Sequence, residues 1–568
     1  MAISRRQRVA DVLVGRLLRQ VPARTDYAVE PVRSRMRDGT ELAGDHYGPR
    51  DGRARGTVLI RTPYGRGFPT SSLNGRLLAA RGYHVLIQSV RGTFGSGGRI
   101  EPMAQETEDG LDTVGWLREQ EWFDGRLATL GGSYLGWTQW AILQDPPPEL
   151  RTSVIYVGPH DFRASTYGTG AFTLGDFLGW SFQITRQEDN GGLRRLLDTV
   201  AAGRRLRPVY AGLPLPEAAE TVLRGRAPWY REWATRTDAS DPWWEARRAG
   251  AALERVTTPI LLVSGWQDLF LEQTLEQFAV LTGRGLDVGL TVGPWTHLEV
   301  GSRAEGRLSR ETLAWLDEHM AGGPPARRQP VSVFRTGERR WHDLPSWPPP
   351  SSPAVFRLHR AGTLTLIHPT TDETENQESA EFTHSQDAAD KAENDRVIFR
   401  YDPSDPTPTV GGRTLSGSMG VKDNRPLEAR PDVRAFTTDP LPTAVDVIGS
   451  PVLDLAISAD TRHADVFVRL CDVDERGHSR NFSDLMHRLD PDVPAGEVHH
   501  LHLTLDACFH RLRAGHRLRL LVTGGSFPRY ARAVDDSGTL TPSHRTVHCR
   551  PSRLTLPVAP PPPSLGLP

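Results

Sequence analysis

The chain has 568 residues, 38% of them hydrophobic, and a formal net charge of −1 at pH 7. Such a length predicts more than one domain, because single hydrophobic cores stop growing near about 250–300 residues. The balanced charge gives no electrostatic reason to expect nucleic acid or an acidic polymer as a partner. The three cysteines, Cys471, Cys508 and Cys549, are too few and too scattered to indicate a disulfide framework or a metal site.

Residues 1–26 form a basic segment before the first predicted strand. Between Arg8 and Gln20, arginine alternates with valine, leucine and alanine. This pattern predicts a basic amphipathic helix that packs against the body or a partner subunit, with attachment to a membrane surface as the alternative. The Arg5-Arg6 pair lacks the longer apolar run of a twin-arginine export signal, and no stretch approaches the roughly 20 apolar residues of a transmembrane helix. We therefore expect a cytoplasmic protein without an integral membrane segment.

Residues 27–150 alternate short apolar runs with helical patterns. This alternation predicts the first part of an α/β domain, with a parallel sheet and crossover helices. The expected strands are 57–60, 85–87, 127–130 and, just beyond this part, 153–157.

A serine lies between glycines where one of these strands is expected to turn into a helix, in the run Gly131-Gly132-Ser133-Tyr134-Leu135-Gly136. Such a turn is typical of the nucleophile elbow of α/β-hydrolases, where strained backbone geometry exposes the serine hydroxyl. Glycines leave room for the strand and helix that cross there. The spacing is G-x-S-x-x-G rather than G-x-S-x-G, so the motif alone is weak, and an ordinary turn is the alternative.

A serine nucleophile needs a general base and a carboxylate that orients this base. In α/β-hydrolases the acid and then the histidine follow the serine, each on a loop after a strand. An apolar run over 259–263 leads into Asp268, and a second run over 286–292 leads into His297. The order predicts a Ser133, Asp268 and His297 triad. The alternatives are a helix N-cap for Asp268 and a chance position for one of 19 histidines.

The remaining chain divides on composition. Residues 151–252 are predicted to form a helical cap insertion, because strand signals fade beyond about residue 160 and aromatic residues become frequent. We expect these aromatic side chains to form the core of the cap, with the lining of a substrate pocket as the second interpretation. The α/β domain resumes over 253–328 and its sheet is expected to end by about residue 325. Alternating strands, such as 355–359, 466–470 and 518–522, predict a β-sandwich over 329–556. Residues 370–395 are expected to form a solvated hairpin, and the Pro-rich tail 557–568 a disordered end.

Together these residues resemble the CocE/NonD family of serine hydrolases, which includes cocaine-esterase-like enzymes and X-prolyl dipeptidyl-peptidases. The blocks that carry the resemblance run in order over roughly residues 27–555. They are 61–64, 88–92, 108–122, 131–136, 265–268, 293–297, 401–403, 408–412 and 526–530. The resemblance implies an α/β-hydrolase domain with a helical cap insertion and a C-terminal β-sandwich of the jelly-roll type.

The resemblance also implies roles for individual residues. Ser133 would be the nucleophile, His297 the general base and acid, and Asp268 the orienting carboxylate. The oxyanion hole would consist of the Tyr64 hydroxyl and the backbone N–H of Tyr134, and losing one such donor typically costs about 3–4 kcal/mol of barrier. The alternative for Tyr64 is a core tyrosine at a strand end.

One position departs from the family. An aspartate usually stands where this chain has Ser89, next to the pair matched by Arg91-Gly92. A local ion pair from this position to Arg91 is therefore in doubt here.

The leading hypothesis is ester hydrolysis through an acyl-enzyme. Related α-amino acid ester hydrolases carry acidic residues just after the catalytic aspartate to bind a substrate ammonium, whereas Leu269, Phe270 and Leu271 stand there in this chain. We therefore expect a neutral acyl group, with Phe270 and Trp266 as substrate-binding residues. No metal and no cofactor is expected. The expected partners are a small-molecule ester or a short peptide, with a homodimer as a further hypothesis.

Two other functions stay open. The first is a peptidase or amidase of the X-prolyl dipeptidyl-peptidase type, or a pathway-specific acyl hydrolase or acyltransferase. The dipeptidyl-peptidase ranks lower because those enzymes carry a substantial extra N-terminal domain, whereas a short helix precedes the first strands here. The second is a non-catalytic carbohydrate-binding protein, for which the sequence offers neither an aromatic ladder nor the spacing of a calcium loop.

Overall fold

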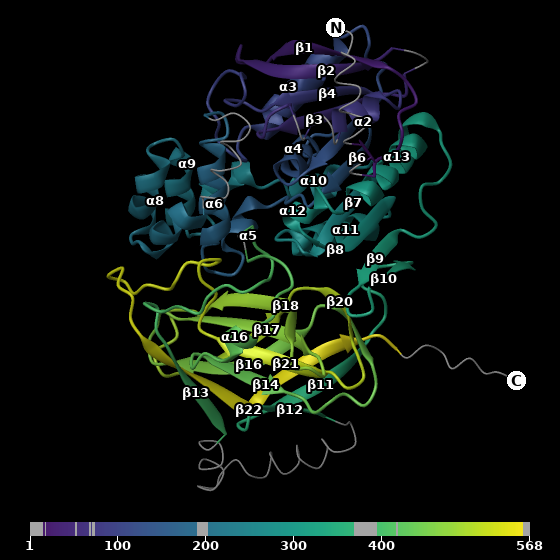
Figure 1. Cartoon of the computed structure of the whole chain (residues 1–568). Helices are drawn as coiled ribbons and strands as arrows, with labels where there is room; N and C mark the ends of the chain where they lie inside the picture. The colour runs from purple at the N-terminus through teal and green to yellow at the C-terminus, as the bar shows by residue number, and fades with distance from the viewer. Residues whose placement is uncertain are drawn as a thin grey trace, which may run out of the picture.

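The computed structural model describes residues 15–16, 19–50, 54–67, 70, 74–189, 203–367, 395–415 and 418–560. An α/β part forms the upper body in Figure 1 and an all-β part the lower one. The helix predicted within 1–26, the hairpin predicted over 370–395 and the tail 557–568 lie mostly outside the described residues. In the part of the chain that is described, none of the helices has the length and apolar character needed to cross a membrane.

A ten-stranded sheet forms the centre of the α/β part, in the order β1-β2-β4-β3-β5-β6-β7-β8-β9-β10. From β4 across to β9 neighbouring strands pair in parallel, whereas β1, β2 and β10 pair antiparallel at the two edges. The strands are β1 (Tyr27–Arg35), β2 (Glu41–Pro49), β3 (Thr57–Thr62), β4 (His84–Ser89), β5 (Leu127–Gly132), β6 (Leu150–Tyr156), β7 (Ile260–Gln267), β8 (Val288–Thr296), β9 (Val331–Arg335) and β10 (Arg340–Leu344).

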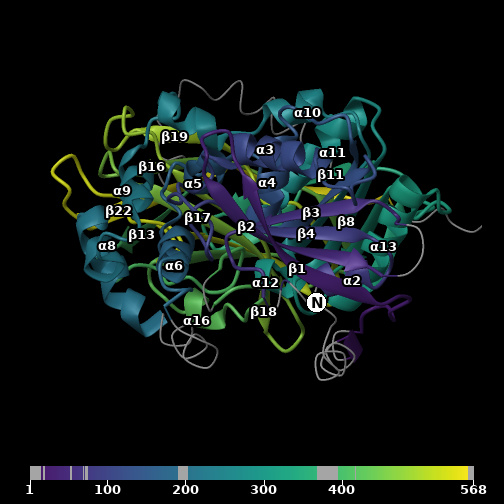
Figure 2. The same ribbon diagram turned by 90° about the horizontal axis from the view of Figure 1, so that it is seen from above.

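Helices cover both faces of this sheet, which explains why the central strands are apolar runs rather than alternating ones. Along β3, Leu59 belongs to the core of one face, whereas Val58 and Ile60 belong to the core of the other. Figure 2 shows α3, α4, α10 and α11 along one side of the strands and α2, α12 and α13 along the other. These helices are α2 (Arg76–Ala79), α3 (Glu106–Arg118), α4 (Tyr134–Ile142), α10 (Ala251–Arg255), α11 (Leu271–Gly283), α12 (His297–Val300) and α13 (Glu305–Ala321).

The sheet extends further along the chain than expected. Strands β9 and β10 continue it to Leu344, although the sheet was expected to end by about residue 325 and residues from 329 onward were assigned to the β-sandwich. Both strands are short, with five residues each. Periodicity identifies a strand but does not say which of two sheets it joins, because that choice depends on pairing with a distant partner, here β8.

A helical insertion follows β6 (Leu150–Tyr156), and this strand lies, apart from its first residue, inside the range 151–252 predicted for the cap. The helical elements are α5 (Phe162–Tyr167), α6 (Leu174–Ile184), α8 (Leu215–Leu223), α9 (Pro228–Thr235) and the 3-10 helix η2 (Pro242–Arg247). Their core is aromatic: the Phe162 ring lies 5.0 Å from Phe177 and 4.7 Å from Trp233, measured between ring centroids. Edge and tilted contacts of this kind add to the free energy gained by burying the rings.

The C-terminal part is all-β, as predicted, and its twelve described strands form one hydrogen-bonded network. Its core is a separate apolar cluster that includes Leu358, Val468 and Leu520. The strands are β11 (Ser352–His359), β12 (Thr363–Leu366), β13 (Arg396–Tyr401), β14 (Val433–Thr437), β15 (Val445–Gly449), β16 (Val452–Ala459), β17 (Asp465–Val473), β18 (Ser479–Arg488), β19 (Val498–Thr504), β20 (Cys508–Leu512), β21 (Arg517–Thr523) and β22 (Ser543–Val558), with the short helix α16 (Arg425–Glu428). All three cysteines lie buried as free thiols.

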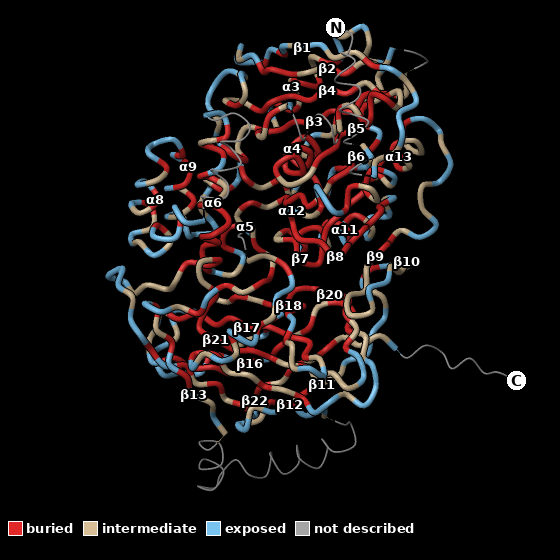
Figure 3. Tube along the Cα trace, in the orientation of Figure 1, coloured by how far each residue is buried: buried red, intermediate tan, exposed pale blue. Residues whose placement is uncertain are grey.

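Polar contacts join the two parts. Arg413, in the loop after β13, donates to Glu272 of α11 over 3.2 Å and to Asp506 of the β-part. The Asn481 amide donates to Gln267 at the end of β7 over 3.4 Å. In Figure 3 the tube around α4, α12, β7 and β8 is red, so the carboxyl ends of the central strands lie buried within the molecule. The C-terminal part therefore helps to enclose the edge of the sheet at which a catalytic site is expected.

Candidate active site

Ser133 occupies a strained turn between β5 and α4. Its backbone has φ of +60° and ψ of −123°, a conformation that residues with a side chain rarely adopt. Close contacts explain why glycine stands at two positions near this turn. A Cβ on Gly131 would lie 2.4 Å from the Cβ of Leu135, and a Cβ on Gly136 would lie 2.6 Å from the Cα of Gly158. The turn therefore has the geometry of a nucleophile elbow, and it presents the Ser133 side chain at the carboxyl end of β5.

Asp268 and His297 reach the same place from two later strands of the same sheet. Asp268 follows β7, and His297 is the first residue of α12, directly after β8. The His297 Nε2 lies 2.9 Å from the Ser133 Oγ, and the His297 Nδ1 lies 2.7 Å from the Asp268 Oδ1. The hydroxyl of Ser264 donates to the second carboxylate oxygen of Asp268 over 2.9 Å. The three residues predicted from the sequence thus form one hydrogen-bonded series.

The chemistry of the groups sets the direction of these hydrogen bonds. A carboxylate only accepts, so the His297 Nδ1 carries the proton toward Asp268, and the Nε2 is left to accept the proton of Ser133. Asp268 is fully buried and His297 is buried. Low solvent access strengthens the electrostatic interaction between the carboxylate and an imidazolium. The arrangement can therefore remove a proton from Ser133 and hold the resulting positive charge.

Tyr64 lies in the turn after β3, with its phenol beside the nucleophile. Its backbone N–H donates to the Thr62 hydroxyl over 3.0 Å, which shapes the turn. The indole Nε1 of Trp180, from α6 of the cap, donates to the phenol oxygen over 3.0 Å. Burial raises the pKa of Tyr64, and hydrogen bonds with Trp180 and Ser133 oppose that rise. The phenol therefore keeps its proton at neutral pH and can donate it in a hydrogen bond.

Tyr134 presents its backbone and its side chain in different directions. It is the first residue of α4, where N–H groups have no partner within the helix. Its hydroxyl donates to the Glu106 carboxyl over 2.7 Å and accepts from the backbone N–H of Met103 over 3.2 Å. Burial raises the pKa of Tyr134 well above its ordinary value, and the charge of Glu106 adds to the rise. The phenol is thus committed to the core, and the backbone N–H is the donor of Tyr134 that remains at the elbow, directly after Ser133.

The two residues predicted to bind substrate lie in different surroundings. The Phe270 ring stands edge-on to the imidazole of His297, with 5.4 Å between ring centroids. The indole of Trp266 donates to the backbone carbonyl of Phe334 in β9 over 2.6 Å and packs against Trp347 at 5.2 Å. Phe270 therefore borders the Ser133–His297 pair, whereas the contacts of Trp266 are with β9 and the segment after β10. Substrate binding by either residue stays a prediction.

The surroundings of Arg91 bear on the departure at Ser89. Arg91 forms ion pairs with Asp109 and Asp38, each at 2.6 Å. The Ser89 hydroxyl accepts a hydrogen bond from Arg66 over 2.6 Å. The loop after β4 therefore keeps its ionic anchoring with other carboxylates.

Three neighbours of the site were not identified from the sequence. Ser264 stands four residues before Asp268, and the acid motif could have indicated it. Trp180 was assigned to the aromatic cluster of the cap, and its donation to Tyr64 joins residues 116 positions apart. Asp176 lies on α6 one turn before Trp180, and it is buried against the C-terminal part. No local pattern could identify the last two contacts, because each depends on how the cap packs on other domains.

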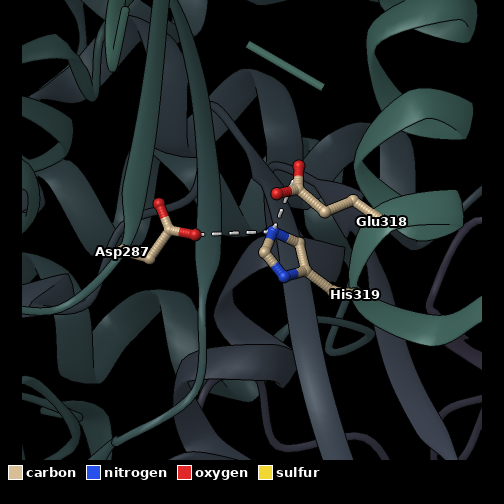
Figure 4. A group of neighbouring side chains, drawn as sticks. All are labelled: Asp287, Glu318 and His319. Atoms are coloured by element: carbon tan, nitrogen blue, oxygen red, sulfur yellow. Dashed lines mark ion pairs between the residues drawn. The ribbon is translucent and has the colours of Figure 1, made fainter. Parts of the chain in front are cut away.

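One group of side chains has the spacing of a metal site. In the described ranges, Asp287, Glu318 and His319 each offer a ligand atom within 4.8 Å of the others (Figure 4). The His319 Nε2 lies 3.7 Å from Asp287 and 3.8 Å from Glu318, and Asp287 is exposed. The Glu318 oxygen that faces His319 also accepts from the backbone N–H of Ala326 over 2.7 Å. The group includes none of the residues around Ser133.

Comparisons of the sequence with known proteins point to one family. The family model described as X-Pro dipeptidyl-peptidase (S15 family) matches residues 38–299, and the model of the X-Pro dipeptidyl-peptidase C-terminal non-catalytic domain matches residues 326–555. The cocaine esterase of Rhodococcus sp. (strain MB1 Bresler) is 29% identical over 550 residues, which cover 89% of this chain and 92% of that protein.

Two solved structures resemble the fold over nearly the whole chain. An α-amino acid ester hydrolase superposes with a TM-score of 0.75 at 21% identity, covering 95% of this chain and 98% of that one. A CocE/NonD family hydrolase from Staphylococcus aureus superposes with a TM-score of 0.68 at 16% identity, covering 94% of each chain. At these identities the likeness concerns the arrangement of the α/β part, the cap and the all-β part.

Proposed function

This chain belongs to the CocE/NonD hydrolases of the X-Pro dipeptidyl-peptidase family and is a serine hydrolase; we propose that Ser133, His297 and Asp268 form its catalytic triad and that it cleaves carboxylic esters. One observation carries the proposal: the two distances of 2.9 and 2.7 Å that join the serine, the imidazole and the buried carboxylate. The family resemblance predicted from the sequence motifs is confirmed.

The geometry supports a two-step reaction through an acyl-enzyme. His297 takes the proton of Ser133 while the serine oxygen attacks the ester carbonyl, and then gives this proton to the leaving alcohol. In the second step His297 removes a proton from water, the resulting hydroxide attacks the acyl carbon, and Ser133 recovers its proton from the imidazole. Asp268 holds the imidazole in the required tautomer and stabilises the imidazolium that forms in both steps.

The negative charge that develops on the carbonyl oxygen requires hydrogen-bond donors. We assign this role to the Tyr64 hydroxyl and the Tyr134 backbone N–H. Tyr64, in the turn after β3, is hydrogen-bonded with the Ser133 side chain, and Tyr134 is the first residue of α4, directly after Ser133. Fixed donors in a site with little water stabilise a developing charge strongly, because they need no reorganisation during the reaction.

The residues after Asp268 favour a neutral acyl group. Phe270 places an aromatic edge against His297. Glu272 is the nearest following acidic residue, and its carboxylate already accepts from Arg413 over 3.2 Å and from the backbone N–H of Ala507 over 2.9 Å. A substrate ammonium would have to compete with both donors. We therefore propose small esters with an uncharged acyl part as the substrate class.

Cleavage of peptide or amide bonds is the second candidate, and the match to the dipeptidyl-peptidase family model favours it. An ester has the better leaving group, so the same triad should act on esters faster than on anilides. The cytoplasmic location and the homodimer remain predictions, which fractionation and size-exclusion chromatography with light scattering would test.

A fluorophosphonate probe tests the proposed nucleophile. We expect one adduct, mapped to Ser133 by mass spectrometry, that is absent from Ser133→Ala and strongly slowed in His297→Ala. Ser302→Ala is the matched control, because Ser302 is an exposed serine shortly after His297. An adduct on another serine, or none, would refute the triad. A panel of aryl and alkyl esters beside Xaa-Pro-anilides then separates the two candidate functions.

A further inference from the structure

The cap supplies a hydrogen bond to the proposed oxyanion donor. The Trp180 indole N–H donates to the Tyr64 phenol oxygen over 3.0 Å, and Tyr64 is also hydrogen-bonded with the side chain of Ser133. Trp180 lies in addition almost parallel to the Tyr134 ring, with an interplanar angle of 4° and 5.9 Å between centroids. One cap residue therefore contacts both tyrosines that flank Ser133.

The chemistry of the phenol gives this contact a direction. A tyrosine hydroxyl has one proton to donate and two lone pairs that accept. An indole N–H only donates, so Trp180 occupies a lone pair of Tyr64 and the phenol proton cannot point toward the cap. This proton is left to point toward Ser133 and the oxygen of a bound carbonyl. Accepting a hydrogen bond also makes the phenol a better donor, because neighbouring hydrogen bonds polarise one another.

The C-terminal part holds the helix that carries Trp180. Asp176, one turn earlier on α6, accepts through its Oδ1 from the Thr414 hydroxyl and from the Leu415 backbone N–H, each over 2.7 Å. Asp176 is only 1% exposed, so these hydrogen bonds form away from water. Its neighbour Gly175 approaches the same domain closely, since a Cβ there would lie 2.8 Å from the carbonyl oxygen of Pro528.

We infer that Trp180 and Asp176 are positioning residues through which the C-terminal all-β domain orients the Tyr64 hydroxyl toward the oxyanion. The path runs from Thr414 and Leu415 to Asp176, along one turn of α6 to Trp180, and from its indole to Tyr64. The inference rests on the proposed function, because it assigns a role in transition-state stabilisation to residues that touch neither the nucleophile nor its base. It gives a catalytic contribution to a domain that holds none of the proposed triad residues.

A double-mutant cycle between Trp180 and Tyr64 tests the first step. Trp180→Phe keeps an aromatic ring against Tyr134 but removes the N–H, and we expect kcat for an aryl ester to fall about three- to tenfold with little change in KM. In a Tyr64→Phe background, which has no hydroxyl to orient, the same substitution should change kcat less than about twofold. An equal loss of kcat in both backgrounds, or a loss confined to KM, would show that Trp180 acts through packing or substrate contact and would overturn the inference.

Variants of Asp176 test the connection to the C-terminal domain. Asp176→Asn retains an oxygen that accepts from Thr414 and Leu415, so we expect kcat close to that of the wild-type protein. Asp176→Leu removes the acceptor and should reproduce the loss seen in Trp180→Phe, without adding to it in the double variant. Thr414→Val removes one donor from the other side and should give a smaller loss in the same direction, which keeps the test open if Asp176→Leu does not fold. Wild-type kcat in both Asp176→Leu and Thr414→Val would overturn this step.

Labelling with the fluorophosphonate probe, carried out on every variant, distinguishes a failure of the proposed function from a failure of the inference about Trp180. If the wild-type protein is not labelled at Ser133, the proposed function fails and the inference about Trp180, which rests on it, fails with it. If Ser133 is labelled but the losses of Trp180→Phe and Tyr64→Phe are additive, the triad stands and the inference about the C-terminal domain fails.

Discussion

The hydroxyl of Ser264 donates a hydrogen bond of 2.9 Å to the Asp268 carboxylate, on the oxygen that His297 does not use. Ser264 lies within β7, four residues before Asp268, and both side chains are fully buried. A buried carboxylate that has lost contact with water needs hydrogen-bond donors on both oxygens. Ser264 therefore fixes the plane of the carboxylate and leaves the other oxygen to the imidazole.

Replacing Ser264 by alanine should weaken catalysis without abolishing it. We expect kcat for an aryl ester to fall about three- to tenfold in Ser264→Ala, the range that one hydrogen bond supplies, with KM nearly unchanged. Asp268→Asn should be far more damaging, by about 10⁴-fold in kcat, because an amide favours the wrong tautomer of the imidazole. Steady-state kinetics of the two variants measures the contrast, and equal losses would contradict the supporting role given to Ser264.

Removal of the Tyr64 hydroxyl should lower the rate of chemistry rather than substrate binding. In Tyr64→Phe the ring is retained and one proposed oxyanion donor is lost, so we expect kcat to fall about 10²- to 10³-fold. Slow labelling of Ser133 by a fluorophosphonate should accompany this loss, since the phosphoryl oxygen occupies the same place as the oxyanion. A variant with unchanged kcat would show that Tyr64 is a core residue at a strand end.

Replacing Tyr134 by phenylalanine should lower the stability of the protein rather than the rate of catalysis. The Tyr134 hydroxyl donates to buried Glu106, whose pKa is raised by burial and lowered in part by Arg61, and its backbone N–H is the proposed oxyanion donor. Tyr134→Phe leaves the backbone donor in place but deprives Glu106 of a hydrogen bond. We expect the free energy of unfolding to fall by about 1–3 kcal/mol, while kcat of the folded enzyme changes little. Urea denaturation together with kinetics below the transition distinguishes this outcome from a catalytic role of the phenol.

The sequence allowed the α/β fold to be predicted because its central strands are buried on both faces. The apolar runs before Ser133, Asp268 and His297 are β5, β7 and β8, and parallel strands bring their carboxyl ends to one edge. Local pattern therefore placed these side chains near each other. It could not assign β9 and β10 to the same sheet, since a five-residue strand carries no information about its partner.

The contacts that join the site to other domains could not be predicted from the sequence either. Trp180 has the apolar surroundings of any cap tryptophan, and its donation to Tyr64 depends on how α6 packs against the α/β part and the C-terminal part. Asp176 is a single acidic residue in an apolar helix, and nothing in its neighbours along the chain predicts a partner more than 230 positions away. Interactions of this kind are products of packing, so the structure is needed to identify them.

Glu305, at the start of α13, makes the stability of the protein depend on pH. Burial raises the pKa of Glu305 to about 7, partly offset by the hydrogen bond that Gln20 donates over 2.8 Å. An unfolded glutamate titrates near about 4.3, so the folded protein holds this proton more tightly. The stabilisation from the neutral carboxyl is complete below about pH 4.3 and is lost as the pH rises through about 7.

Glu305→Gln removes this titration and keeps an oxygen that can accept from Gln20. We expect the free energy of unfolding of the variant, relative to the wild-type protein, to rise by about 3 kcal/mol between pH 4.5 and pH 8, following about 1.4 kcal/mol for each unit of pKa difference. Comparing the two proteins at each pH cancels the contribution of every other titrating group. Glu121→Gln, which changes an exposed glutamate, is the matched control and should show no such trend. Urea denaturation across this pH range provides the measurement, and a difference between Glu305→Gln and the wild-type protein that stays constant with pH would contradict a buried, protonated Glu305.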